Sequence, residues 1–340
     1  MDSRERVVRA IEMTGPDRVP ITHASLPGAH KRYGRKLEEL YDRYPSDTFS
    51  VGGATQGEFG PEIGVPSRDT WGSAWVRYTD EHKGQVVAHP LGDWDALSGF
   101  EPPNTASDEI MDAVRAKIGC ARGRYTISDG DILWQRMFYL HGYAEILEDL
   151  LLQPDRCAEL RDMIFGVMRR RVVRLCEIPE LDGIAFRDDW GTQESLMISP
   201  ALWRSFFKPY YAELFSLTRD AGKHVWFHSD GVIDSIIPDF IEIGVQVLNP
   251  QVDAMGKETV AGLCGGVICI HGDIDRQFAL PYGTTDDVRR AVREDVAAFG
   301  RFRGGYIGRG EVAGDVPLEN VDAMYDEMLH SVGDTATTLL

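Results

Sequence analysis

Two adjacent carboxylates, Asp188 and Asp189, follow the short apolar segment 183–186. Adjacent carboxylates repel each other, which raises the pKa of one of them and lets it serve as a general acid. The ordinary structural explanation is that one carboxylate caps the next segment and the other is solvated. We expect at least one of the pair to face a catalytic pocket. Trp190 follows them directly, so it either offers a flat apolar wall to a ligand or packs in the core.

An imidazole and a carboxylate, His228 and Asp230, stand two positions apart directly after the short segment 224–227. Alternate residues of a strand point to the same side, so both can face one pocket if the strand continues through them. Imidazole and carboxylate groups bind metal ions and transfer protons. The alternative is a hydrogen-bonded imidazole at a tight turn that ends in Gly231.

Later segments add His271, Asp273 and Glu311 to the candidates. His271 follows the apolar segment 267–270, and it is a potential ligand or proton donor unless it is a buried imidazole satisfied by hydrogen bonds. Glu311 follows a glycine-rich loop and is either a site residue or an exposed acid. Arg309 can pair with Glu311 or bind an anionic group of a substrate.

These side chains need strands and helices that bring them to one rim. From about Gly123 onward, short segments of strand length alternate with segments of helical period, and the connections are short. That alternation indicates a parallel sheet, and its length favours a closed barrel of eight strands. The predicted strands are 123–128, 181–186, 224–228, 245–248, 267–271 and 306–307, and the predicted helices are 108–118, 134–152, 154–176, 200–222, 232–243, 259–263, 286–300 and 319–330.

The first third of the chain is less regular. Residues 3–13 have helical period, with Ser3 as the N-cap, and residues 19–21 have the composition of a first strand. Residues 45–104 are rich in Gly, Trp, Pro and Asp, so we expect loops and a small hairpin that cover a site.

The elements together indicate one domain over residues 1–340, an α/β fold of the (β/α)8 TIM-barrel type. An N-terminal loop-rich elaboration with the first strands spans 1–120, and the main barrel spans 121–335. In such barrels the catalytic side chains come from the carboxyl ends of the strands, which is where the polar candidates stand.

Composition limits the partners and the location of the protein. The chain of 340 residues carries a formal net charge of −18, so nucleic acid and anionic membranes are repelled and are not expected as partners. No run of about 18 apolar residues occurs, and the charged N-terminus lacks an apolar leader, which indicates a cytoplasmic protein. The five cysteines include no CxxC pair, so a disulfide framework is not expected.

Several motifs occur along the chain in the same order as in one protein family. The motifs are RERVVRAIEMTGPDRVP, DTWGSAW, LHGYAEILEDLLLQPD, ISPALWRSFFKPYY, HSDG, GVQVLNP, HGDID and DVPLEN. The chain resembles the uroporphyrinogen decarboxylase superfamily, which also contains cobalamin-dependent and coenzyme M methyltransferases. The resemblance extends from about Ser3 to about Met328 and implies the TIM-barrel fold and a homodimer.

The resemblance is closer to the methyltransferase branch than to the true decarboxylases. The decarboxylases carry an arginine-rich segment, RQAGR, that binds the propionates of the porphyrin, and the corresponding residues here, 22–36 (THASLPGAHKRYGRK), lack it. Methyltransferases of the branch bind zinc through a His-x-Cys pair and a distant cysteine. His228 and Asp230 align with the pair, and Glu311 lies nearest to the distant cysteine. The resemblance therefore implies these three as zinc ligands, in a site of harder nitrogen and oxygen donors, or a site that binds no metal.

Three functions remain open from the sequence. The first is a metal-assisted methyltransferase that acts on a small O- or N-methylated substrate, with a corrinoid as methyl acceptor or donor and a corrinoid protein as a partner. The second is a metal-free carboxy-lyase similar to uroporphyrinogen decarboxylase. The third is a barrel that binds a corrinoid or another ligand without turnover. The catalytic candidates are Asp188, Asp189 and His271, and the candidates for cofactor binding are Trp190, Asn249 and Asp273.

Overall fold

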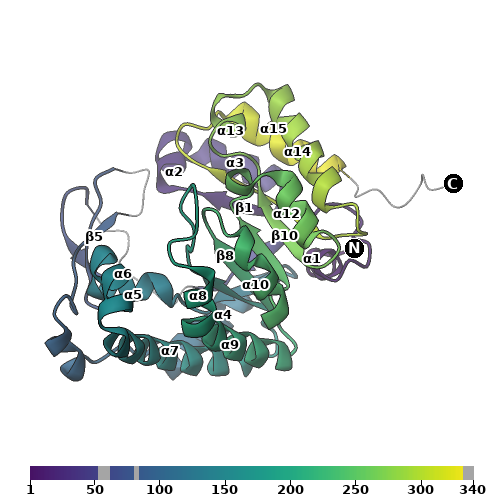
Figure 1. Cartoon of the computed structure of the whole chain (residues 1–340). Coiled ribbons are helices and arrows are strands. Elements are labelled where there is room, and N and C mark those ends of the chain that lie inside the picture. Colours follow the sequence, from purple (N-terminus) through teal and green to yellow (C-terminus); the bar gives the residue numbers. More distant parts are fainter. Residues whose placement is uncertain (53–61, 80–83, 332–340) are drawn as a thin grey trace.

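Eight parallel strands form a nearly closed barrel in the computed structural model, which describes residues 1–52, 62–79 and 84–331 (Figure 1). The strands follow the order β1-β11-β10-β9-β8-β7-β6-β2 around the barrel. The predicted (β/α)8 TIM barrel is therefore confirmed. The strand bounds are Ile21–Ser25 (β1), Thr48–Ser50 (β2), Tyr125–Asp129 (β6), Gly183–Arg187 (β7), His224–Ser229 (β8), Val247–Pro250 (β9), Cys269–Asp273 (β10) and Tyr306–Val312 (β11).

Helices cover the outer face of the barrel, because each strand buries one face against them. Figure 1 shows α7 and α9 along the lower side and α14 and α15 along the upper side. The predicted helix 134–152 divides at Gly142, whose φ of 122° no helix accommodates. The bounds are Asp108–Ile118 (α4), Trp134–His141 (α5), Tyr143–Leu152 (α6), Pro154–Cys176 (α7), Pro200–Phe206 (α8), Lys208–Asp220 (α9), Asp234–Ile236 (η2), Ile237–Ile243 (α10), Val252–Met255 (α11), Lys257–Cys264 (α12), Ala279–Tyr282 (α13), Thr285–Phe299 (α14) and Leu318–His330 (α15).

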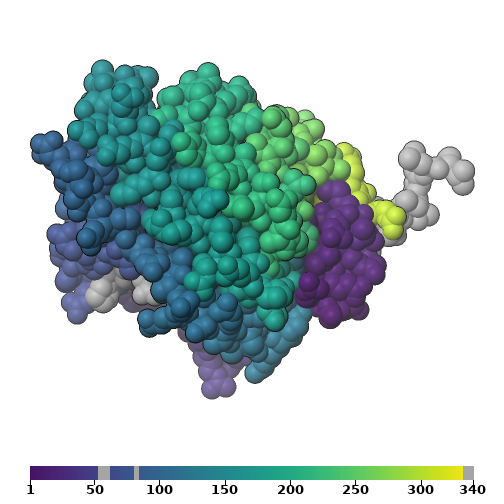
Figure 2. All heavy atoms as spheres, turned by 90° about the horizontal axis from the view of Figure 1, so that it is seen from below, coloured from purple at the N-terminus to yellow at the C-terminus, as the bar shows by residue number. Residues whose placement is uncertain are grey.

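The helix α1 (Ser3–Ile11) closes the amino end of the barrel. Its backbone bonds the residues just before β6 and β11, since Arg4 N donates to Gly123 O at 3.2 Å and Gly305 N donates to Ala10 O at 2.8 Å. Asp2, and not the predicted Ser3, caps the helix, because the Asp2 carboxylate accepts from Glu5 N. Figure 2 shows these first residues in purple beside the yellow C-terminal part of the chain.

The N-terminal elaboration is more ordered than the expected loops. The helices α2 (Pro27–Tyr33) and α3 (Arg35–Arg43) follow β1, and a small antiparallel sheet contains β3 (Ser67–Arg68), β4 (Ala74–Val76) and β5 (Gln85–Ala88), followed by the 3-10 helix η1 (Trp94–Gly99). The short strand β2 belongs to the barrel itself. The parts of the predicted loop segment at 53–61 and 80–83 lie outside the described residues. No helix in the described ranges has the length and apolar character needed to cross a bilayer.

A buried carboxylate, Asp47, joins β1 to the start of β2, the two end strands of the barrel order. Asp47 Oδ2 accepts from Ile21 N, and Asp47 N donates to Ile21 O, each at 2.9 Å. The guanidinium groups of Arg6 and Arg18 neutralise this carboxylate at 2.7 Å and 2.8 Å. A side chain thus closes the barrel at this position.

Candidate metal centre

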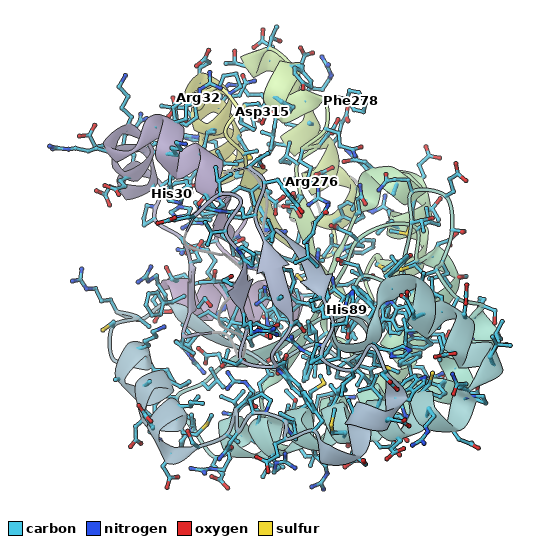
Figure 3. All side chains as sticks on the ribbon, turned by 90° about the vertical axis from the view of Figure 1, so that its left-hand side faces the viewer. His30, Arg32, His89, Arg276, Phe278 and Asp315 are labelled. Atoms are coloured by element: carbon cyan, nitrogen blue, oxygen red, sulfur yellow. The ribbon has the colours of Figure 1, made fainter. Side chains whose placement is uncertain are left out.

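Alternation along the strands directs a set of polar side chains to the carboxyl end of the barrel. Ala185, Trp226 and Ile307 pack in the inner core that α1 closes. The residues two positions further along β7, β8 and β11 therefore point to the same axis, nearer the carboxyl ends. These inward residues are Arg187, His228 and Arg309, and the same alternation adds Asp129, Asn249, Asp273 and Glu311. Figure 3 shows this end of the barrel, with Arg276 of the loop after β10 near the centre of the view.

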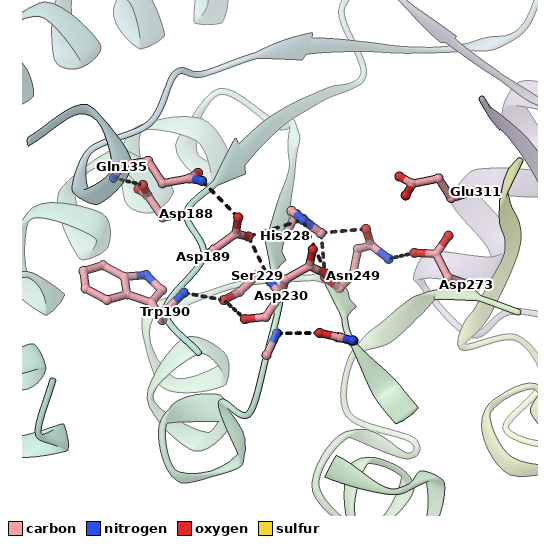
Figure 4. A network of polar contacts seen from close by, with 12 residues as sticks. Gln135, Asp188, Asp189, Trp190, His228, Ser229, Asp230, Asn249, Asp273 and Glu311 are labelled. Carbon is pink, nitrogen blue, oxygen red and sulfur yellow. Dashed lines mark hydrogen bonds and ion pairs between the residues drawn. The ribbon is translucent and has the colours of Figure 1, made fainter. Parts of the chain in front are cut away.

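Three side chains at this end, Asp189, His228 and Asp230, form a group that could hold a metal ion. One ligand atom from each lies within 4.8 Å of the others. His228 Nε2 is 3.5 Å from Asp189 Oδ1 and 3.9 Å from Asp230 Oδ1 (Figure 4). The three side chains are half-buried, with exposed fractions of 25–35%. Imidazole nitrogen and carboxylate oxygens are a donor set that Zn²⁺ accepts.

The contacts of Asn249 fix which nitrogen of His228 faces the carboxylates. His228 Nδ1 lies 3.1 Å from Asn249 O and 2.8 Å from Asn249 Oδ1, and both of these atoms are acceptors. Asn249 Oδ1 is assigned as the oxygen because it also accepts from Arg309 Nη1 at 2.8 Å. Nδ1 must therefore carry a proton, and Nε2, which has the free lone pair in the neutral ring, faces Asp189 and Asp230. Metal-binding histidines are held in this way, with the other ring nitrogen donating to an oxygen.

Asp189 and Asp230 each accept hydrogen bonds from neighbouring donors. Asp189 Oδ2 accepts from Gln135 Nε2 at 2.9 Å, and Asp189 Oδ1 accepts from Asp230 N at 2.9 Å. Asp230 Oδ1 accepts from Arg276 Nη2 at 2.8 Å. These donors fix the rotamers of both carboxylates while leaving lone pairs directed at His228.

The predicted third ligand, Glu311, lies apart from this group. Its carboxylate stands between two guanidinium groups, at 3.2 Å from Arg276 Nη1 and 3.2 Å from Arg309 Nη2. Arg276 separates Glu311 from Asp230, because the same guanidinium bonds both carboxylates. Figure 4 shows Glu311 on the far side of the site from Asp189. Asp189, which the sequence suggested as a catalytic residue, is the third member of the group of possible ligands in place of Glu311.

Asp188 is a helix cap and does not line the site. Its side chain is fully buried and accepts from Leu133 N at 2.8 Å and from Gln135 N at 2.7 Å, at the start of α5, and from the hydroxyl of Tyr211. Burial raises the pKa of Asp188 to about 7 against these donors. The sequence predicted a raised pKa from repulsion within the acid pair, whereas burial is the cause here. The affected carboxyl faces α5, so the catalytic role expected for Asp188 needs correction.

His271 is a half-buried imidazole below the rim. Its Nε2 lies 2.6 Å from Thr22 Oγ1, and its ring meets Trp226 edge to face at 5.2 Å. Burial, followed by the nearby Arg309 charge, lowers the pKa of His271 to about 3. The neutral ring is therefore favoured, which argues against His271 as an imidazolium proton donor.

Trp190 is a core residue. Its side chain has no exposed surface and stacks on Trp134 at 5.3 Å, with Phe207 at 4.7 Å. The segment after β7 directs this ring into the helix layer, where it packs on Trp134 and Phe207. The expected binding wall is therefore corrected to an aromatic cluster that supports the segment after β7.

Asn249 and Asp273 stand at the rim but bond each other and an arginine. Arg309 Nη1 donates to Asp273 Oδ2 at 2.6 Å, and Asn249 Nδ2 donates to the same oxygen at 3.1 Å. These contacts indicate that the two residues hold His228 in position, Asn249 directly and Asp273 through Asn249, more directly than they indicate binding of a cofactor.

Four residues of the site were missed from the sequence: Gln135, Arg276, Asp129 and Arg187. Asp129 and Arg187 form an ion pair at the carboxyl ends of β6 and β7. They could have been found from the alternation of the predicted strands, since each lies two positions after an inner-core contact residue. Gln135 and Arg276 belong to a helix start and a loop, where no period indicates their direction.

Comparison with known proteins identifies the family and the fold. A family model described as Uroporphyrinogen decarboxylase (URO-D) matches residues 79–330. Among solved structures, a methyltransferase from Methanosarcina mazei has a TM-score of 0.68 and 14% identity, over 96% of this chain and 98% of that chain. A glycosylated endo-beta-1,4-xylanase from Gloeophyllum trabeum has a TM-score of 0.44 and 9% identity, over 92% and 96% of the two chains, and carries no argument about function. At these identities the likeness establishes the fold alone. No curated protein matches the chain.

Proposed function

Because the chain belongs to the uroporphyrinogen decarboxylase (URO-D) family, we propose that it is a metal-dependent methyltransferase of that family. It would move a methyl group between a small O- or N-methylated substrate and a corrinoid, with a corrinoid protein as a partner. The whole chain, 1–340, would act as one barrel domain. The observation that carries the proposal is the group formed by Asp189, His228 and Asp230, whose possible ligand atoms all lie within 4.8 Å of one another.

The charges at the rim support a divalent cation in this group. Five described carboxylates face three guanidinium groups here, so negative charge is in excess by about the charge of one divalent ion. The carboxylates are those of Asp129, Asp189, Asp230, Asp273 and Glu311, and the guanidinium groups are those of Arg187, Arg276 and Arg309. Two carboxylates that face an imidazole lone pair without a shared donor are stabilised when a cation lies between them.

We assign Asp189, His228 and Asp230 as the ligands, with Glu311 outside the set. The donor set of one nitrogen and two oxygens suits Zn²⁺, and the absence of a thiolate favours activation of an oxygen- or nitrogen-linked methyl group over capture of a thiol. Zinc bound there supplies a Lewis acid that draws electron density from the heteroatom that bears the methyl group.

The remaining residues hold the ligands and the substrate in place. Asn249 fixes the His228 tautomer, Gln135 fixes Asp189, and Arg276 fixes Asp230 while it neutralises Glu311. Such supporting contacts preorganise the group, so no reorganisation is needed when substrate arrives. Arg276, which is 24% exposed, also lies where a leaving alkoxide would gain from a nearby positive charge.

The arrangement disfavours the decarboxylase alternative. A substrate with many carboxylates needs several fixed cations with free donors. Arg276 and Arg309 each bridge two carboxylates of the protein, and Arg187 pairs with Asp129. Binding a polyanionic macrocycle would therefore break these ion pairs. A barrel without turnover would have no use for the contacts that hold the three candidate ligands in place.

Methyl transfer to cob(I)alamin tests the proposal. The chain is treated with a chelator, reloaded with zinc, and mixed with methoxyacetate, 2-methoxyethanol, 4-methoxybenzoate or N,N-dimethylglycine. We expect methylcobalamin to form from at least one donor, only with the zinc-loaded protein. Coproporphyrinogen formed from uroporphyrinogen in a parallel reaction, with no methylcobalamin from any donor, would instead establish the decarboxylase.

A further inference from the structure

An arginine at the rim, Arg187, points into the mouth of the barrel beside the candidate metal ligands. It ends β7, two positions after Ala185, which packs in the inner core, so its side chain is directed to the barrel axis. In the parallel ladder its partner on β8 is His228. Neighbouring strands lie about 4.8 Å apart, so the guanidinium starts from a backbone position adjacent to that of the imidazole ligand.

Arg187 has donors to spare, unlike the other two arginines of the rim. A guanidinium carries five N–H donors. Among the described residues, the hydrogen bonds of Arg187 go to one carboxylate, from Nη2 to Asp129 Oδ2. Arg276 and Arg309 each bridge two carboxylates, and their side chains are 24% and 16% exposed, whereas that of Arg187 is 45% exposed.

We propose that Arg187 binds a carboxylate of the substrate, and that the substrate is therefore a small methylated monocarboxylate. The inference rests on the proposed function, because it concerns the molecule that the metal would activate. Asp129 occupies one edge of the guanidinium, and the other edge, either Nε with Nη2 or Nη1 with Nη2, matches a carboxylate in bidentate geometry. One arginine with one free edge accommodates one carboxylate, which distinguishes this class from neutral methyl donors and from polycarboxylates.

The position of Arg187 also limits the size of the substrate. The carboxylate would lie on the β7 side of the mouth and the methylated heteroatom beside His228, one strand away. A methoxy acid or an N-methyl amino acid, with the heteroatom a few bonds from the carboxylate, spans such a distance. Asp129 places a negative charge beside the proposed carboxylate site, so removal of that charge should strengthen binding by reducing repulsion.

Two matched probes test the proposal: methoxyacetate, and 2-methoxyethanol, which has the same ether and a hydroxyl in place of the carboxylate. Their affinities are measured by calorimetry or ligand-observed NMR on the full chain, both zinc-loaded and metal-free. We expect methoxyacetate to bind at least about tenfold more tightly than 2-methoxyethanol, and Arg187→Gln to abolish that difference. We expect Asp129→Asn to tighten methoxyacetate binding several-fold.

Control variants separate this role from others. Arg187→Gln leaves Asp129 unpaired, so Arg187→Gln/Asp129→Asn removes both charges and is expected to bind methoxyacetate as weakly as Arg187→Gln. Arg290→Gln, whose arginine pairs with Asp287 on the outer helix α14, is expected to bind like wild type. Zinc content is expected to be unchanged in all four variants, since among the described residues Arg187 makes no hydrogen bond or ion pair with a candidate ligand.

Unchanged methoxyacetate affinity in Arg187→Gln would overturn the proposal, and so would equal affinity for the two probes in wild type. Loss of zinc from Arg187→Gln would also overturn the proposal, because it would show that Arg187 supports metal binding. The affinities measured on the metal-free protein report the contribution of Arg187 without that of the metal. A preference for methoxyacetate there, lost in Arg187→Gln, supports the anion site even if the protein were to bind no zinc.

Discussion

The imidazole Nε2 of His228 lies 3.5 Å from Oδ1 of Asp189, although the two residues belong to different strand–helix units of the barrel. Parallel pairing of β7 and β8 places them together, because it sets Arg187 opposite His228 and so brings the segment after β7 beside the end of β8. The lone pair of that nitrogen faces two carboxylates, and this arrangement is the basis of the proposed metal centre.

Asn249 is expected to control metal affinity without touching the metal. Asn249→Ala removes the side-chain acceptor for His228 Nδ1–H, so the ring loses part of what fixes its orientation. We expect zinc affinity to fall by about 10–100-fold, measured by competition with a chromogenic chelator. Gln277→Ala, an exposed residue of the loop after β10, is the control and should keep wild-type affinity. Equal affinities in both variants would remove Asn249 from the site.

Asp189 and Glu311 are expected to differ sharply as metal ligands. Asp189→Asn should lower zinc affinity by more than about tenfold, because the carboxylate within reach of His228 loses its charge. Glu311→Gln should change zinc affinity little, because Arg276 separates that carboxylate from Asp230. The same chelator competition decides between them. If Asp189→Asn kept its zinc affinity and Glu311→Gln lost it, the ligand set that the sequence implied would be restored.

Asp188 is expected to make stability depend on pH. Its pKa is about 7 in the folded protein and near 3.8 in the unfolded chain, so between these values the folded state binds more protons. The stability contributed by Asp188 is therefore present below about pH 4 and decreases as pH rises toward 7. We expect the melting temperature of Asp188→Asn to fall less between pH 5 and pH 8 than that of wild type. Parallel pH profiles for the two proteins would contradict this assignment.

Trp190 is expected to matter for stability and not for ligand binding. Trp190→Ala should cost about 3–5 kcal/mol in the free energy of unfolding, because it opens a cavity beside Trp134 and Phe207. Trp190→Phe should cost less and should leave methoxyacetate and zinc affinity as in wild type. Urea denaturation and calorimetry provide the two readouts. A loss of methoxyacetate affinity in folded Trp190→Phe would show that this ring contributes to the binding site.

The sequence was sufficient for the barrel and for part of the site. Alternation of strand-like and helical segments after Gly123 predicted the parallel sheet, and the polar residues after two apolar segments predicted His228, Asp230 and Asp189 at its rim. Prediction failed for β2, because three residues, Thr48–Ser50, carry too little alternation to indicate a strand.

The rest of the site depends on which strands pair and on which way the side chains point, and a single sequence does not give this information. Glu311 and Asp189 both belong to the rim, but only the strand order shows that Asp189 neighbours His228 while an arginine intervenes before Glu311. Asp188 and Trp190 were misassigned because the segment after β7 leaves the strand, so which side chain faces inward is set by contacts with α5. Arg276 lies in a loop, and no period predicts where it points.

X-ray absorption at the zinc K-edge of the zinc-loaded protein tests the proposed centre most directly. We expect a ligand shell of nitrogen and oxygen at about 2.0–2.1 Å that includes an imidazole, with no sulfur at about 2.3 Å. His228→Ala should lose the imidazole contribution together with most of the metal. A sulfur ligand, or an unchanged spectrum in His228→Ala, would show that the metal lies elsewhere and that the group of Asp189, His228 and Asp230 is not its site.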